Sequence, residues 1–360
     1  AVLIDAPPVR QFDERQPAAD HAPADVRPEP ARRGAERDLQ IEEFDVVEHG
    51  APVAVIATDA DGEPVVESLP TLSGATLLQV KRYAAAVSAG DPRVLDIDSV
   101  YASEWMRGAH ILVTGANRGI GLSLVGEAVR CGAHVYAVCR KLSPELEALK
   151  EGAAASGGYV DVILGLELTD YNSCEAIADI LDSPLGAPPL DVVINNAGYF
   201  PDGKDDLTAG LAIEENLKQY DICALGPLRV TAALVRAGRV KAPGGKVINI
   251  TSQGGSAVWR QVQNAGEGGD YGHHMGKAAA NMAGALLAEE LRPRGIAVAN
   301  LHPGFNRTDM TRKYEAIWDI EGAVESEVGA KRVMHEVGRV GLLESGCPFV
   351  NCEDGLLIPY

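Results

Sequence analysis

The chain has 360 residues, a formal net charge of −19 and a pI of about 4.8, and 46% of its residues are apolar. That apolar content is enough to bury a core, so the sequence predicts a globular protein. No apolar run approaches the length of a membrane-spanning helix, about 20 residues, so no transmembrane segment is predicted. The strong negative charge argues against a nucleic acid or an anionic lipid surface as the main partner.

The first 45 residues are rich in charge and proline, and residues 1–40 alone contain six prolines. Such a segment cannot bury enough surface to offset its ordering entropy, so residues 1–45 are predicted to be a tail that is disordered without a partner. The chain begins at Ala1 with no signal-like segment after it. We therefore expect that any targeting peptide has already been removed.

Residues 46–108 are predicted to form a small α+β extension of the ββαβ type, similar to a β-grasp unit. The run "APVAVIATDADGEPVVESL" alternates and turns as a hairpin does, "GATLLQVKRYAAAVSAG" has helical periodicity closed by Gly90, and "PRVLDIDSV" is expected to be a further strand. Residues 1–108 carry 20 acidic and 10 basic residues, which is −10 of the total −19. Two interpretations stay open: a solvated acidic face, or a docking surface for a basic protein partner.

From residue 109 to residue 360, short apolar runs alternate with helical stretches. This βαβ series predicts an α/β fold, with a Rossmann-type doubly wound parallel sheet and helices on both of its faces. The series comprises strand "HILVTGA", helix "GLSLVGEAVRCG", strand "HVYAVCR", a helix near residues 144–150, strand "YVDVILGLEL", helix "YNSCEAIADIL" and strand "DVVINNAG".

A glycine-rich turn, "TGANRGIG" at residues 114–121, lies between the first strand and the first helix of this series. Glycines there let the chain turn sharply and admit a pyrophosphate against backbone amides at the positive end of a helix. In this context the turn predicts a dinucleotide site.

The same turn resembles that of the short-chain dehydrogenase/reductase family, and the chain is similar to its carbonyl reductases. The resemblance extends to the C-terminus through "INNAG", "KVINITSQGG", "GKAAANM", "LHPGFNRTDM" and "FVNCEDGLLIPY". It implies a set of dinucleotide contacts, which are Gly115, Asn117, Arg118, Gly119, Ile120, Gly121, Arg140, Glu167, Asn195, Ala197, Gly198, Lys277, Pro303, Gly304 and Thr308.

The charges after the second strand favour NADP(H) over NAD(H). An NAD site needs a carboxylate there, whereas an NADP site needs cations for the 2′-phosphate. The strand ends "AVCRK", so Cys139 stands where the acid would be and Arg140 and Lys141 follow, while Arg118 lies inside the glycine-rich turn. A solvated loop is the alternative explanation for the arginines.

The catalytic group of the family is only half present. The resemblance implies that Ser252 binds the carbonyl oxygen and that Lys277 holds the ribose and lowers the pKa of a tyrosine four residues earlier. That position is His273, and the position of the family's water-anchoring asparagine is Cys223. Both departures remove a polar group from the route of the proton.

Two residues are candidates for the missing acid. An imidazole can act as a general acid, but His273 reaches on the order of 2 Å less far than a phenol, and Lys277 disfavours its protonated form. Tyr271 lies six residues before Lys277, so it faces away from the lysine unless the segment bulges. His274 is adjacent to His273 and would point in a different direction, which argues against a metal pair.

Scattered cysteines, with no C-x-x-C pair, predict buried thiols and no metal site. Such thiols suit a reducing compartment, the cytoplasm or the interior of an organelle such as the plastid stroma or the mitochondrial matrix. The six are Cys131, Cys139, Cys174, Cys223, Cys347 and Cys352.

Three functions stay open. The first is an NADP(H)-binding pseudoenzyme with impaired or absent catalysis, a structural or cofactor-sensing accessory subunit of a larger, organellar assembly. The second is an active NADPH-dependent carbonyl or aldehyde reductase that uses His273 or Tyr271 as the proton donor. The third adds a regulatory binding module at residues 1–108. The helix that contains "GKAAANMAGALLAEEL" would suit a homo-oligomer interface or a tight contact with the sheet.

Overall fold

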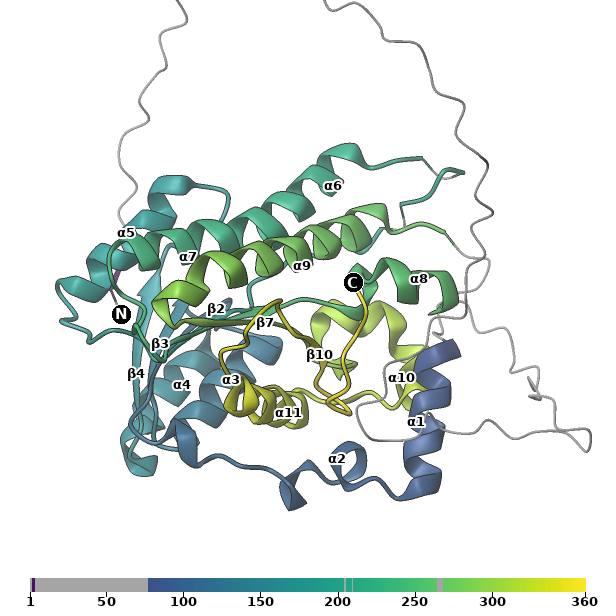
Figure 1. The fold of residues 1–360 in the computed structure, drawn as a ribbon, viewed down its shortest axis with the longest axis horizontal. Coiled ribbons are helices and arrows are strands. Elements are labelled where there is room, and N and C mark those ends of the chain that lie inside the picture. The colour runs from purple at the N-terminus through teal and green to yellow at the C-terminus, as the bar shows by residue number, and fades with distance from the viewer. Residues whose placement is uncertain (1, 4–76, 204, 209, 264–267) are drawn as a thin grey trace, which may run out of the picture. The chain divides into compact units, whose positions relative to one another are not determined.

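The computed structural model describes residues 2–3, 77–203, 205–208, 210–263 and 268–360. Their centre is a parallel sheet with the strand order β1-β4-β3-β2-β5-β6-β7-β10 (Figure 1). The order reverses direction between β2 and β5, as in a doubly wound sheet, so the predicted α/β Rossmann-type fold is confirmed. The strands are β1 (Val2–Leu3), β2 (His110–Thr114), β3 (His134–Cys139), β4 (Tyr159–Leu164), β5 (Val192–Asn195), β6 (Lys246–Ile250), β7 (Ala297–His302) and β10 (Phe349–Asn351).

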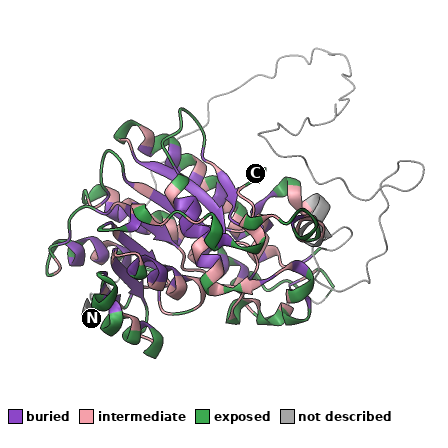
Figure 2. Cartoon of the chain, turned by 90° about the horizontal axis from the view of Figure 1, so that it is seen from below, coloured by how far each residue is buried: buried purple, intermediate pink, exposed green. Residues whose placement is uncertain are grey.

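Alternation along the strands divides the apolar side chains between two layers of helices. Ile111 and Val113 pack into the core beneath α3, α4 and α11, whereas Leu112 packs beneath α5, α7 and α9. Figure 2 shows the buried strands between helices whose outer surfaces are exposed. These helices are α3 (Gly119–Arg130), α4 (Pro144–Gly152), α5 (Tyr171–Asp182), α7 (Gly226–Arg236), α9 (Tyr271–Leu291) and α11 (Ser326–Arg339).

Shorter elements surround the carboxyl ends of the strands, where parallel sheets of this kind bind ligands. They are α6 (Ile213–Tyr220), the π-helical turn η4 (Asp221–Leu225), η5 (Gln253–Gly255), α8 (Ala257–Gln263), β8 (Asn306–Arg307), η7 (Asp309–Ile317), α10 (Trp318–Glu321) and β9 (Val324–Glu325). No helix among the described residues is both long and apolar enough to cross a membrane.

The extension is helical where the structure describes it. The predicted helix forms as α1 (Leu77–Ala89) and ends at Gly90, which has a φ of 63°. The strand expected in "PRVLDIDSV" is wrong, because those residues form α2 (Pro92–Leu95) and η1 (Ile97–Ser99). The side chain of Asp91 accepts a hydrogen bond from the amide of Arg93 (2.9 Å), and Pro92 at the first helical position favours the same start. The expected hairpin lies outside the described residues.

Two residues of the predicted tail belong to the sheet. Val2 and Leu3 pair with Ile163 and Leu164 as the parallel edge strand β1, so the expectation of disorder is wrong for them. The rest of the tail lies outside the described residues. All six cysteines are free thiols, and all but the half-buried Cys131 are buried.

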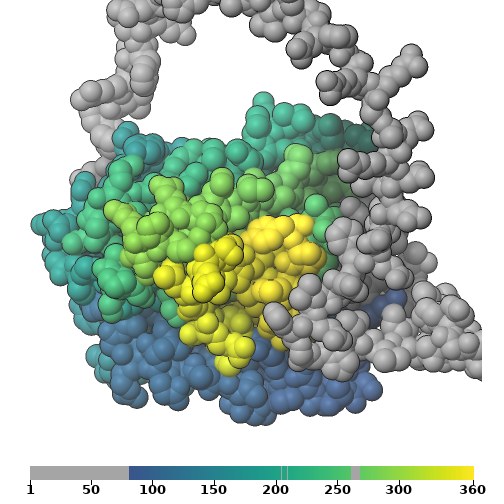
Figure 3. All heavy atoms as spheres, viewed as in Figure 1, coloured from purple at the N-terminus to yellow at the C-terminus, as the bar shows by residue number. Residues whose placement is uncertain are grey.

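The described residues from Leu77 onward belong to one compact unit with the sheet. Met106, in η2 (Glu104–Met106), is fully buried in the core cluster under α3. Figure 3 shows the blue residues of the extension beside the yellow C-terminal residues on one face of the molecule. The part of the extension described here therefore packs as part of the main body.

Candidate active site

A cavity of about 860 Å³ lies at the carboxyl ends of the central strands. Its walls come from the loops that follow β2, β3, β4, β5, β6 and β7, and from the first turns of α9. Ser252, His273 and Lys277 all contribute to these walls. The fold thus brings Ser252, at the end of β6, into one cavity with His273 and Lys277 of α9.

The glycine-rich turn is held closely against the end of β5. Thr114 Oγ1 accepts hydrogen bonds from the amides of Asn196 and Ala197, both at 3.1 Å. A Cβ on Gly115 would lie 2.8 Å from Ala197 Cα, and one on Gly121 would overlap the Gly115 carbonyl. Only glycine fits these two positions, which leaves backbone amides and the N-terminus of α3 facing the cavity.

Nearly all the expected dinucleotide contacts line this cavity. Asn195 does not: its side chain is buried and donates hydrogen bonds to Thr231 Oγ1 (3.1 Å) and Asn249 Oδ1 (3.0 Å). It belongs to strand β5, where its side chain is directed between neighbouring elements instead of toward the cavity. The residues that line it are Gly115, Asn117, Arg118, Gly119, Ile120, Gly121, Arg140, Glu167, Ala197, Gly198, Lys277, Pro303, Gly304 and Thr308.

Two arginines supply positive charge where the glycine-rich turn and the end of β3 border the cavity. Arg118 and Arg140 both line it with exposed side chains, and neither forms an ion pair within the described residues. Burial raises the pKa of the Cys139 thiol to about 11, so this wall carries no negative charge from Cys139. Lys141 does not line the cavity; its carbonyl accepts a hydrogen bond from Cys139 Sγ (3.3 Å).

Ser252 and Lys277 are both fixed by backbone contacts. Ser252 Oγ accepts a hydrogen bond from the amide of Gly254 (3.0 Å), as a cap of the short turn η5. Lys277 Nζ donates to the carbonyl of Ile250 (3.1 Å) at the end of β6. Both polar groups therefore lie where the end of β6, the turn η5 and α9 meet.

His273 faces the cavity beside them. Its ring lies 4.4 Å from that of Phe200, measured between centroids. Burial holds the pKa of His273 well below 6.5, and the nearby charges of Lys277 and other basic groups lower it further. The imidazole is consequently neutral near neutral pH, which weakens it as an acid.

His274 also lines the cavity, with its ring nearly perpendicular to that of His273 (76°). Their rings are 5.5 Å apart, and both flank Gly254, whose carbonyl accepts a hydrogen bond from His274 Nδ1 (2.7 Å). The absence of a side chain at Gly254 leaves room for both imidazoles. Among the described residues, no group of three or more His, Cys, Asp or Glu is arranged to hold a metal ion.

The alternative acid, Tyr271, does not line the cavity. It is the first residue of α9, which runs regularly from that point to Leu291. The six-residue offset from Lys277 therefore turns Tyr271 away, and the bulge that would direct it inward is not present. Asp270, which precedes it, has a φ of 50° and lines the cavity instead.

Cys223 lies in the π-helical turn η4, buried behind the cavity wall. Its Sγ accepts a hydrogen bond from the amide of Tyr199 (3.5 Å) and donates to the carbonyl of the same residue (3.6 Å). A Cβ on Gly198 would lie 3.9 Å from Cys223 Sγ and 4.0 Å from Lys277 Nζ. Cys223 therefore borders the region around Lys277 without reaching the cavity.

Several cavity residues were missed by the sequence analysis, among them Phe200, Lys313 and His302. Phe200 and Lys313 form one wall, with Lys313 Nζ 3.4 Å from the centroid of the Phe200 ring. His302 is buried at the end of β7, and neither of its ring nitrogens has a hydrogen-bond partner within the described residues. Only His302 had a sequence signal, since it directly precedes the Pro303 of a recognised motif.

The family model described as short chain dehydrogenase matches residues 109–317. The chain belongs to the short chain dehydrogenase family. One relative is the 3-oxoacyl-[acyl-carrier-protein] reductase FabG of Vibrio harveyi, which is 30% identical over 63% of this chain and 85% of the relative. Another is the C-signal protein of Myxococcus xanthus, which is 38% identical over 34% of this chain and 69% of the relative.

Solved structures of the short chain dehydrogenase fold resemble this one. The NADPH-bound carbonyl reductase from chicken fatty liver is 24% identical, with a TM-score of 0.56 over 71% of this chain and 100% of that chain. A short chain dehydrogenase from Burkholderia cenocepacia J2315 in complex with NADP is 24% identical, with a TM-score of 0.57 over 69% of this chain and 98% of that chain. The family match begins at residue 109, so α1 and α2 lie outside it.

Proposed function

We propose that this short chain dehydrogenase family member binds NADP(H) and has impaired or absent carbonyl reductase activity. The observation that carries the proposal is the position of His273, which faces the cavity beside Ser252 and Lys277 with a depressed pKa. Most of the expected dinucleotide contacts line the cavity, whereas histidine stands at the position of the acid.

The cofactor assignment rests on charge and on close backbone approach. The amides of the glycine-rich turn and the N-terminus of α3 fit a pyrophosphate, and Arg118 and Arg140 fit a 2′-phosphate. The absence of a carboxylate at Cys139 removes the group that would favour a free 2′-hydroxyl. The chicken carbonyl reductase and the Burkholderia cenocepacia protein, which share this fold, hold NADPH and NADP respectively.

The chemistry of reduction requires a proton as well as a hydride. Bound NADPH supplies the hydride, and the Ser252 hydroxyl is placed to bind a carbonyl oxygen. A neutral His273 has no readily lost proton, since burial and Lys277 both disfavour the imidazolium. Cys223 lies behind the cavity wall, and its thiol forms hydrogen bonds with the backbone of Tyr199. It therefore does not replace the asparagine side chain that would anchor a water molecule.

The role we assign is structural or cofactor-sensing, as an accessory subunit of a larger assembly. The first 108 residues hold more than half of the net negative charge, −10 of −19, which would suit a basic protein partner. A cofactor-sensing subunit needs the dinucleotide site and has no need of a proton donor.

Two measurements test this function. Fluorescence titration of the full chain with NADPH and NADH is expected to show tighter binding of NADPH, and tighter binding of NADH would contradict the cofactor assignment. An NADPH-oxidation assay over aldehydes, ketones and quinones is expected to stay at background. Turnover that disappears in Ser252→Ala would contradict the loss of catalysis.

A second function, an active NADPH-dependent reductase, is favoured by the presence of His273 in the same cavity as Ser252 and Lys277. In that case His273 is the donor, and turnover should increase as the pH falls toward the depressed pKa of its imidazole. Replacement His273→Phe then abolishes turnover. Retention of activity in that variant would exclude His273 as the acid.

A further inference from the structure

The loop that follows β7, residues 303–306, is built against Glu353. Gly304 has a φ of 82°, and a Cβ on it would lie 2.5 Å from Glu353 Cγ. Glu353 Oε1 accepts a hydrogen bond from the amide of Phe305 (3.2 Å), and the side chain of Asn306 closes the loop by donating to the Pro303 and Gly304 carbonyls. All four residues of this loop line the cavity.

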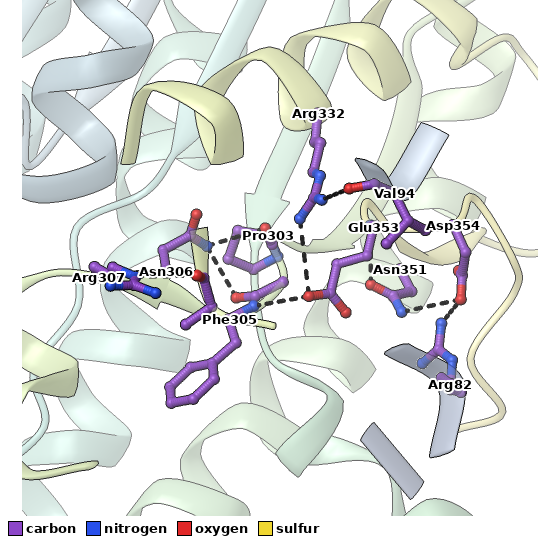
Figure 4. A network of polar contacts seen from close by, with 12 residues as sticks. Arg82, Val94, Pro303, Phe305, Asn306, Arg307, Arg332, Asn351, Glu353 and Asp354 are labelled. Carbon is purple, nitrogen blue, oxygen red and sulfur yellow. Dashed lines mark hydrogen bonds and ion pairs between the residues drawn. The ribbon is translucent and has the colours of Figure 1, made fainter. Parts of the chain in front are cut away.

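Glu353 is in turn linked to the extension through a buried arginine. The Arg332 side chain is 1% exposed, and its Nη1 lies 4.0 Å from Glu353 Oε1. Its Nη2 donates a hydrogen bond to the carbonyl of Val94, in α2 (Figure 4). A buried guanidinium is stable only with such compensation, so α2 and Glu353 depend on the same side chain.

The first helix of the extension contacts the neighbours of the same loop. Arg82 of α1 forms an ion pair with Asp354, the residue after Glu353, and Asp354 also interacts with Asn351 (3.5 Å). Figure 4 shows Arg82 and Arg332 reaching this acidic segment from two elements. Arg82 of the extension and Arg332 of α11 therefore hold the segment that carries Glu353 from two elements.

Tyr83 makes a second route from α1 to the loop. A Cβ on Gly322, which has a φ of 72°, would overlap the Tyr83 ring, so the two residues are in close contact. Gly322 leads into strand β9, which pairs with β8, and the amide of Val324 donates to the carbonyl of Phe305 (3.1 Å). Phe305 is thus held at its amide by Glu353 and at its carbonyl by β9.

We propose that α1 and α2 act as a brace that fixes the loop 303–306, and that Arg82 and Tyr83 are positioning residues for dinucleotide binding. The proposal rests on the proposed NADP(H) function. The extension lies outside the family match yet contacts the segments that hold one wall of the cavity. It acts through Arg332, Glu353 and β9, and it does not itself touch the ligand.

The test uses the full chain with Arg82→Met, which keeps apolar bulk and removes the charge. We expect the NADPH dissociation constant and the hydrogen-exchange rate of the Phe305 amide each to rise about tenfold, because the ion pair between Arg82 and Asp354 is lost. Exchange in β3 should stay unchanged. Arg82→Lys should recover most of the effect, and the exposed Arg107→Met, in the same extension, should have none.

Two results would overturn the brace: unchanged exchange at Phe305 in Arg82→Met, or an equal rise in β3, which would mean general destabilisation. If Arg82→Met does not fold, Tyr83→Leu removes the contact with Gly322 instead, and exchange at Phe305 is again compared with exchange in β3. If the wild-type chain binds no dinucleotide, the proposed function fails. The exchange measurement still decides the brace in that case.

Discussion

The imidazole of His273 lies against the phenyl ring of Phe200, with the ring centroids 4.4 Å apart and the planes tilted by 33°. Lys313 Nζ is 3.4 Å from the centroid of the same phenyl ring and donates to the carbonyl of Pro201 (2.9 Å). Phe200 therefore joins a neutral imidazole and a cation in one wall. This packing fixes the imidazole of His273 at the cavity wall.

Restoring a phenol at this position should restore some chemistry. A tyrosine at residue 273 extends on the order of 2 Å further than histidine, toward Ser252 and Lys277. We expect His273→Tyr to oxidise NADPH with small aldehydes and ketones about a hundredfold faster than the wild-type chain, the usual contribution of a positioned acid. Steady-state absorbance assays measure this directly.

The matched control is His273→Phe, which has the same ring without the hydroxyl group. It should remain at the wild-type rate. Equal rates for the Tyr and Phe variants would mean that the hydroxyl group donates no proton and that the loss of catalysis has another cause.

The preference for NADPH should depend on two exposed guanidinium groups. We expect Arg118→Ala and Arg140→Ala each to weaken NADPH binding by about tenfold, since a charge-assisted contact at an exposed site is partly screened by solvent. Binding of NADH should change little. Lys141→Ala is the control, because Lys141 is adjacent in sequence but does not line the cavity. Equal losses for both dinucleotides would contradict a contact with the 2′-phosphate.

The sheet and its helices could be predicted because the apolar residues of each segment repeat with the period of either a strand or a helix. The strand from His110 to Thr114 and the helix after it are specified locally, by apolar alternation and by glycines that no other residue can replace. The segment after Gly90 failed for a related reason. Its apolar residues suggested a strand, but the capping by Asp91 and the proline at position 92 favour a helix start.

The candidate site was predictable only where a motif marked it. Ser252, Lys277 and His273 were placed by the resemblance of their motifs to those of the family, and they do share a cavity. Phe200 and Lys313 come from loops without a motif, and tertiary packing alone brings them together. The contact of Arg82 with Asp354 joins segments 272 positions apart, which no local pattern encodes.

Stability should fall as the solution becomes acidic, and His302 should account for part of the loss. Burial lowers the pKa of His302 to about 4. The negative charge of Glu353 raises this pKa, whereas the positive charges of Arg82 and Lys277 lower it further. The unfolded chain takes up a proton near pH 6.5, whereas the folded chain does not until about pH 4. Stability is thus full above about pH 6.5 and decreases below it, by as much as about 3 kcal/mol.

The variant His302→Asn removes this proton uptake. Denaturant unfolding at about pH 7 and about pH 5 should show a smaller loss of stability in the variant than in the wild-type chain. Parallel losses in the two proteins would show that His302 does not titrate in this range.

Two helical glycines should respond in opposite directions to alanine. Gly126 lies in α3, where a new Cβ would meet Leu149 at an ordinary contact distance of 3.6 Å, so Gly126→Ala should raise the free energy of unfolding by about 0.5 to 1 kcal/mol. Gly338 lies in α11, where the Cβ would lie 2.7 Å from Trp105 Nε1. Gly338→Ala should instead lower that free energy by about 1 to 3 kcal/mol, because Trp105 must move.

The smaller variant Trp105→Leu makes room at Gly338, so it tests the cause of that loss. Gly338→Ala should cost less in this background than in the wild-type chain, and a double-mutant cycle of denaturant unfolding measures the difference. Equal costs in both backgrounds would show that Trp105 of the extension does not press against α11. A reduced cost would indicate that the extension and α11 are packed as one core.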